Sequence, residues 1–241
     1  MNLYGNFSGV LSAMTTHKLC GAAESDFLYL AEIHFGYTPR GPLNFGRGYY
    51  LRNGTSTKAP ILAAAGDEFR LPFLVALFDT KTAVMLPPLD LDKNPTNKVT
   101  ETLRSMTSKE HGVTFRFAIE VGMKRLQREE FEWRKMVGKQ DGDDGSLKGS
   151  RYTLVRLAPD FPVASSSKAL SPDLADEDCE TVAELAFGNI MLELKGAGST
   201  GELGERWSLM VVMTALGIHW LRQYGKTNKA TVGAAQKLNS K

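Results

Sequence analysis

The sequence predicts a mainly β (α+β) protein: a closed antiparallel β-barrel of about twelve strands wrapped around a central hydrophobic helix near the C-terminus. Two observations carry this prediction. Short apolar or alternating segments, separated by Gly, Pro, Asn and Asp, fill most of the chain before residue 195, which is typical of consecutive antiparallel strands. The segment 203–223 then combines helical length with apolar side chains in every direction around the helix axis.

The block Trp207–Leu221 forms the centre of this helix. Only Ser208, Thr214, Gly217 and His219 interrupt its apolar side chains. A helix that is apolar all round must be buried on all sides. The block is also shorter than the roughly 20 apolar residues that a membrane span requires. We therefore expect the rest of the chain to surround it.

The clearest strand is Val113–Val121, in which apolar residues alternate with polar ones such as Arg116 and Glu120. This period of two predicts one buried face and one solvated face. An antiparallel sheet of this size usually closes or splits to remove its edges. A barrel of about twelve strands is too wide for its own side chains to fill, so the apolar helix is a suitable plug.

The other strands are predicted at residues 26–35, 48–52, 60–65, 73–78, 83–86, 99–104, 131–136, 152–158, 181–187 and 190–195, and loops at 137–150 and 161–179.

Composition and length predict one domain, residues 1–224, followed by a basic tail, 225–241, that we expect to be disordered. The 241 residues carry a net charge of only +2, which argues against a nucleic-acid partner. Cys20 and Cys179 match no metal or redox spacing. The N-terminus has no secretory signal pattern and the chain has no transmembrane span. An intracellular, cytoplasmic protein is expected, and peripheral membrane association is compatible with this sequence.

Gly196, Gly198 and Gly201 form a G-x-G-x-x-G motif between a strand and a helix, which is the context of a dinucleotide fingerprint. No strand pattern and no acidic ribose anchor follow, so we interpret the glycines as a turn that leads into the helix. Ser199 is a near match to a nucleophile elbow. The only histidine after it is His219, on the buried helix, and no Asp lies between them.

No metal, cofactor or catalytic site is predicted. His17, His34, His111 and His219 have no metal-ligand spacing. His219 is interpreted as a core histidine with a hydrogen-bond partner, because it lies on an apolar helix. The acidic segment 141–144 lacks the pattern of a calcium-binding loop, and we interpret it as solvated.

Basic residues on two groups of predicted strands form the candidate site for an anionic ligand. If the two groups met, they would bind a lipid phosphate through charge-assisted hydrogen bonds. The alternative is that strands with one solvated face carry Lys and Arg there without binding anything. The candidate residues are Arg47, Arg52, Lys58, Arg134, Lys135 and Arg156.

Two motifs resemble a known family: E-x-F-E-W-R at Glu129–Arg134 and G-E-L-G-E-R-W at Gly201–Trp207. Together with the segments 30–34, 47–53 and 152–157, they make residues 27–224 similar to fungal proteins of the tubby C-terminal-like superfamily. The resemblance implies a closed barrel of about twelve strands around a C-terminal helix. Relatives include tubby proteins, which bind phosphoinositides, and phospholipid scramblases. The basic lipid-binding pair of tubby, and the cysteine-rich segment and calcium motif of the scramblases, have no counterpart here.

Three functional hypotheses follow. The first is a non-catalytic binding module for an anionic lipid headgroup, such as a phosphoinositide or another anionic phospholipid, or for a protein partner. The second is a small-molecule enzyme with a pocket at the barrel mouth, in secondary metabolism, that would use His34, His111 or Glu120. The third is a structural or interaction role through the tail, 225–241.

Overall fold

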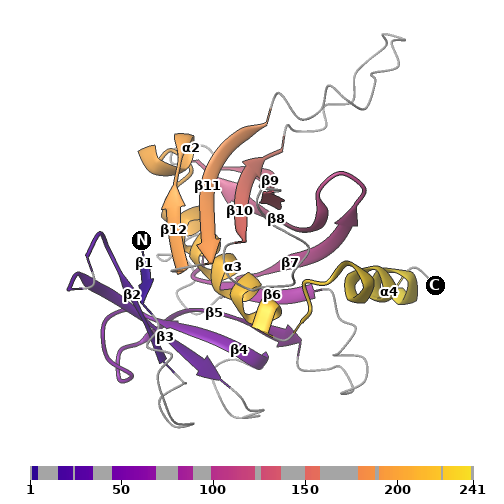
Figure 1. Ribbon diagram of the computed structural model, residues 1–241. Coiled ribbons are helices and arrows are strands. Elements are labelled where there is room, and N and C mark those ends of the chain that lie inside the picture. The colour runs from indigo at the N-terminus through magenta and orange to yellow at the C-terminus, as the bar shows by residue number, and fades with distance from the viewer. Residues whose placement is uncertain are drawn as a thin grey trace.

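The structure is a computed structural model. It describes residues 2–4, 16–23, 25–34, 45–68, 81–88, 99–122, 126–136, 150–157, 179–187, 190–223 and 225–239. These residues form a mainly β protein in which antiparallel strands surround a long helix (Figure 1). The predicted fold class is therefore confirmed at this level.

The strands are β1 (Asn2–Tyr4), β2 (Thr16–Cys20), β3 (Phe27–His34), β4 (Phe45–Arg52), β5 (Ile61–Glu68), β6 (Lys81–Leu86), β7 (Val99–Ser108), β8 (Gly112–Val121), β9 (Gln127–Met136), β10 (Arg151–Arg156), β11 (Glu180–Phe187) and β12 (Ile190–Leu194). The helices are α2 (Gly196–Thr200), α3 (Glu205–Gln223) and α4 (Lys229–Asn239).

The strands from β2 to β12 form one sheet in which each strand pairs antiparallel with the next one along the chain. The short strand β1 pairs with β2 over three residues. It pairs with β12 at a single position, where Asn2 lies opposite Met191. The contact between the two ends of the sheet is therefore much thinner than the ladders elsewhere, which extend over as many as seven residue pairs.

Most of the predicted strands appear in the structure, with shifts of a few residues at their ends. The strand β2 was not predicted. Its alternation is only five residues long, with His17 and Leu19 buried and Thr16 and Lys18 exposed. The predicted strand 73–78 lies outside the described residues, as do nearly all residues of the two predicted loops.

The helix α3 is buried around its whole circumference, as predicted. It packs against β4, β5, β6, β8 and β11. One polar contact fixes its rotation, because the indole Nε1 of Trp133 donates a 3.0 Å hydrogen bond to the hydroxyl of Thr214. The Thr214 hydroxyl in turn donates to the backbone carbonyl of Val211. Within the described residues, no helix combines the length and hydropathy that crossing a bilayer requires.

The glycines before α3 shape the turn that leads the chain from the sheet into the interior. Gly196 and Gly201 adopt left-handed φ angles of 45° and 82°. A Cβ at Gly198 would lie 2.4 Å from the carbonyl oxygen of Val182 and 2.6 Å from the Trp207 ring. Backbone conformation thus favours glycine at positions 196 and 201, and close packing requires it at position 198. This agrees with the interpretation of the motif as a turn.

The C-terminal segment differs from the prediction. Residues 229–239, expected to be part of a disordered tail, form the helix α4. Its Val232 and Ala235 are each only 2% exposed, and the helix packs against β7 and β8. The Asn228 side chain accepts a hydrogen bond from the backbone N–H of Ala230 and begins the helix. The segment offers few apolar side chains, so its pattern did not indicate a packed helix.

Candidate functional site

Two of the predicted basic residues are already held by carboxylates on neighbouring strands. Arg52 donates from Nε and Nη2 to Oε2 of Glu32, at 3.0 and 2.7 Å. Arg156 donates from Nε and Nη2 to the two carboxylate oxygens of Glu129, at 2.6 and 2.7 Å. These hydrogen bonds raise the pKa of the Arg156 guanidinium. Neither guanidinium can bind a phosphate in full without giving up its present partner.

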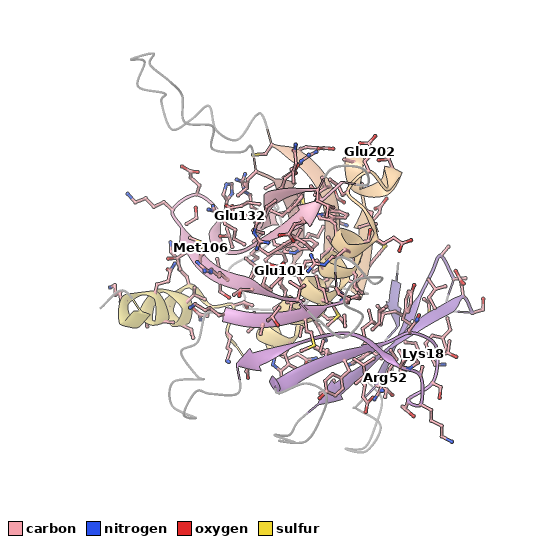
Figure 2. The ribbon with its side chains drawn as sticks, turned by 180° about the vertical axis from the view of Figure 1, so that it is seen from behind. Lys18, Arg52, Glu101, Met106, Glu132 and Glu202 are labelled. Carbon is pink, nitrogen blue, oxygen red and sulfur yellow. The ribbon has the colours of Figure 1, made fainter. Side chains whose placement is uncertain are left out.

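The other predicted basic residues whose side chains are described do not gather at one place. Arg134 donates to Glu132 at 2.9 Å, whereas Lys58 and Lys135 are exposed. The side chain of Arg47 lies outside the described residues. Four strands, β5 to β8, separate β4 from β9 in the sheet. Figure 2 accordingly shows Arg52 and Glu132 on different parts of the molecule.

The three candidates of the enzyme hypothesis do not form one site either. His111 lies in the turn between β7 and β8, whereas Glu120 lies near the opposite end of β8. At about 3.3 Å per residue, these positions are on the order of 30 Å apart along the strand. The side chain of His34 lies outside the described residues.

His219 is a core histidine, as predicted, and it has a histidine neighbour that the sequence did not reveal. Its Nε2 lies 2.9 Å from the amide nitrogen of Gln223. The ring of His17 lies 6.2 Å away, centroid to centroid, and the Phe187 ring stacks on His219 at 6.1 Å. Burial, followed by the nearby charges of His17 and Arg222, lowers the pKa of His219 to about 4. Burial also lowers the pKa of His17, so both rings favour the neutral form.

The strands β7 and β8 pair only near their shared turn. Their ladder extends from Ser108–Gly112 to Arg104–Arg116. Beyond it, Val99–Leu103 pairs only with β6 and Phe117–Val121 only with β9. We call the interval between these two segments the seam. It lies where the start of α3 meets the sheet.

Ion pairs among four charged residues bridge the seam. Arg128 binds Glu101 at 2.7 Å and Glu120 at 2.6 Å. Arg206, from the first turn of α3, binds Glu120 at 3.1 Å and Glu101 at 3.5 Å, and its Nε donates to the carbonyl of Pro87. Burial alone would raise the pKa of Glu120, but the hydrogen bond from Arg128 lowers it. Two carboxylates balance two guanidinium groups, so this network is structural.

A row of three cations crosses the outer face of the sheet. Lys81 on β6 lies directly opposite Arg104 on β7, which lies directly opposite Arg116 on β8. We call these three residues the basic row. Neighbouring strands are about 4.8 Å apart, so the row spans about 10 Å. Lys81 and Arg104 are exposed, and the Arg116 side chain is 39% exposed.

Carboxylates of β9 lie beside the Arg116 end of the basic row. Glu132 is buried and binds both Arg116 and Arg134, each at 2.9 Å. Glu130 lies 3.8 Å from Arg116. Arg104 forms no ion pair within the described part of the chain. Arg104 also has a cation directly opposite it on each neighbouring strand.

Sequence patterns alone do not reveal this site, because it depends on strand register. Arg116 was placed on the solvated face of its strand. Lys81, however, lies before the predicted strand 83–86, and Arg104 ends the weakly alternating segment 99–104. Only the observed pairing shows that the three positions are neighbours.

Comparison of the chain with protein families, with curated proteins and with solved structures finds no match. Within the described residues, no group of three or more His, Cys, Asp and Glu side chains has an arrangement that could hold a metal ion. Function therefore has to be inferred from the chain's own geometry.

Proposed function

We propose that this protein is a non-catalytic binding module that holds an anionic group, the phosphate of a lipid headgroup, on the outer face of β6, β7 and β8. The basic row is the single observation that carries the proposal. It is a different set from the six residues expected from the sequence, three of which have carboxylate partners.

Like charges directly opposite each other on neighbouring strands destabilise a sheet. The basic row contains two such contacts in succession, between Lys81 and Arg104 and between Arg104 and Arg116. A phosphate beside Arg104 would relieve the repulsion and accept charge-assisted hydrogen bonds from its guanidinium group, whereas Arg116 already donates to Glu132. The geometry thus favours occupation by an anion.

A membrane surface is accessible to this row, because the residues project outward from a sheet face. Each Lys or Arg near an anionic leaflet contributes about 1 kcal/mol of attraction. The net charge of the whole chain is only +2. The attraction therefore depends on this local concentration of charge, and we expect binding to be orientation-specific.

The test is sedimentation with phosphatidylcholine vesicles, with and without a phosphoinositide, at physiological salt. We expect the wild type to bind the anionic vesicles, and Arg104→Glu or Lys81→Glu to reduce the bound fraction about tenfold or more. Lys58→Glu is the matched control, because it makes the same charge change at an exposed position of the originally predicted set. Equal binding to neutral vesicles, or an equal loss in the control, would contradict the proposal.

We further infer that β1 closes the sheet into a barrel and that the architecture is of the tubby C-terminal-like type. The pairing of β1 with both β2 and β12 supports closure, and the burial of α3 on all sides supports the architecture. Hydrogen exchange checks the closure: we expect slow exchange of ladder amides in residues 2–4, and exchange at the rate of an unstructured peptide would count against it.

A further inference from the structure

Within the described residues, the C-terminal part of β7 has a neighbouring strand on one side only. Ser105–Ser108 pairs with β8, whereas β6 begins at Lys81, opposite Arg104. The helix α4 lies beside this end of β7 (Figure 1) and packs against it. An uncovered sheet edge is a template for pairing with another chain, and natural proteins often cover one with a helix. α4 serves as this cover.

One contact shows how α4 satisfies a backbone hydrogen-bonding group on this edge of β7. The backbone N–H of Thr107 donates to Oε1 of Gln236 at 3.3 Å, so it points away from β8. The Thr107 hydroxyl donates to the same oxygen. The side-chain amide of Gln236 thus occupies the place where the carbonyl of an added strand would accept. A Cβ at Gly233 would lie 4.0 Å from the Thr107 methyl group, which is an ordinary van der Waals contact, so an alanine would fit at this position.

The composition of α4 gives the helix little stability of its own. Among the side chains of α4 that the structure describes, the buried ones, Val232 and Ala235, are small. Its 11 residues are fewer than the roughly 12–15 that give even a marginal isolated helix in water, and Gly233 in its interior weakens it further. The helix therefore depends on its contact with β7 and β8.

The linker before α4 allows that contact to open without disturbing α3. Gly225 adopts a left-handed φ of 68°. The backbone N–H of Lys226 donates to the carbonyl of Leu221 at 2.8 Å and closes the end of α3. The Lys226 side chain also binds Asp67 of β5 at 3.6 Å. The chain is thus fixed up to residue 226, and α4 is the first element beyond that anchor.

We propose that α4 is a displaceable cover, and that the released edge of β7 accepts an extended segment of a partner protein as an added strand. Main-chain hydrogen bonds would supply the affinity. The outer face of β7 presents Arg104 and Met106 here, and Met106 lies on the arm of the sheet beside α4 (Figure 2). The segment should therefore carry an acidic side chain next to Arg104 and an apolar one next to Met106. This interaction goes beyond lipid binding, because it requires release of α4.

Hydrogen exchange on the full wild-type chain tests the first step. We expect the amides of α4 and the Thr107 amide to exchange together, at least about 100-fold faster than the paired amides of β8 and β9. If the α4 amides exchange as slowly as those of β8 and β9, α4 opens only on global unfolding, and the proposal is wrong.

Binding of a synthetic peptide tests the second step. The probe is a labelled ten-residue peptide of alternating valine and threonine with one glutamate. Its control has a central proline, which removes a backbone donor and cannot join a ladder. We expect Val232→Asp, which expels α4, to bind the probe about tenfold or more tightly than the wild type. Gly233→Ala, which strengthens the helix, should bind it more weakly. The proline peptide should not bind.

Two further variants keep the test decisive. Gln236→Ala removes only the acceptor for Thr107, and we expect it to increase binding even if Val232→Asp fails to fold. Ala234→Asp places the same charge on the exposed side of α4 and should leave binding at the wild-type level. Equal affinity of wild type and Gln236→Ala, or equal affinity for the proline peptide, overturns the proposal. Vesicle binding by these variants should stay unchanged, which separates this failure from failure of the lipid proposal.

Discussion

His219 shows how position on a buried helix changes the chemistry of a single side chain. On the surface, an imidazole is partly protonated near neutral pH. Here it lies on the buried helix α3 beside the rings of His17 and Phe187, and it is only 9% exposed. The neutral form is favoured because a charged form would be poorly solvated beside another histidine and Arg222. A neutral imidazole can remain buried in the core at neutral pH.

This depressed pKa predicts loss of stability in mild acid. Below about pH 6.5 the unfolded chain binds a proton at His219, whereas the folded chain resists until its pKa of about 4. Stability is therefore present above pH 6.5 and is lost as the pH falls toward 4. Between pH 7 and pH 5 we expect a loss of roughly 2 kcal/mol from this residue. Urea unfolding of wild type and His219→Gln at both pH values measures it, and an unchanged pH dependence in the variant would contradict it.

The predicted basic residues show what a sequence cannot specify at this scale. Arg52 and Arg156 were expected to contribute to a ligand site. Their partners, Glu32 and Glu129, are 20 and 27 residues away along the chain and reach them only through strand pairing. Whether a surface arginine is paired or has charge in excess depends on register, which the local pattern does not fix.

At the scale of elements, α3 is the part that sequence reasoning predicted best. Its apolar side chains point in all directions, and the structure buries all of them except the half-buried Leu209. The contact between Trp133 and Thr214 joins the E-x-F-E-W-R strand to this helix. The two most distinctive motifs of the chain are thus neighbours in the core, where Phe131 also packs on Trp207.

A charge placed in the middle of α3 should prevent folding. Met213 is fully buried, and Met213→Lys would leave an unpaired ammonium there at a cost of several kcal/mol. That is comparable with the roughly 5–15 kcal/mol that stabilises an ordinary domain. We expect insoluble protein, measured as the soluble fraction after expression. Glu205→Gln, at an exposed position of the same helix, should stay soluble. A soluble Met213→Lys with wild-type melting temperature would show that α3 is not central.

α4 is the element that the sequence pattern did not predict. Its segment contains lysines, alanines and a glycine, and of the side chains described there only Val232 and Ala235 are buried. Such a segment has little reason to be helical alone. Docking against β7 and β8 supplies the stabilisation, so the helix is a consequence of tertiary contact.

At the scale of the whole molecule, the sheet surrounds α3, but neighbouring strands are not paired along their whole length. The seam between β7 and β8 has no ladder, and ion pairs take its place. Glu101 is central because it contacts both Arg128 and Arg206 and its side chain is only 5% exposed. Arg206 comes from α3, so the network also fixes where the helix meets the sheet.

Removing the Glu101 carboxylate should therefore destabilise the whole protein. Glu101→Ala leaves the guanidinium groups of Arg128 and Arg206 close together with only Glu120 between them, and we expect a loss of about 2–4 kcal/mol in unfolding free energy. Glu130→Ala is the control, because that side chain is 57% exposed and its removal should change stability by less than about 0.5 kcal/mol. Equal urea midpoints for the two variants would show that the seam needs no ion pairs.

The sequence by itself determined the mainly β class, the antiparallel order of the strands, the buried helix and the turn at Gly196, Gly198 and Gly201. Each depends on local periodicity or on backbone freedom, and both are encoded by neighbouring residues. Tertiary structure alone decided the basic row, the seam, the pairing of His17 with His219 and the docking of α4. These features join residues that are distant along the chain, and only register and packing bring such residues together.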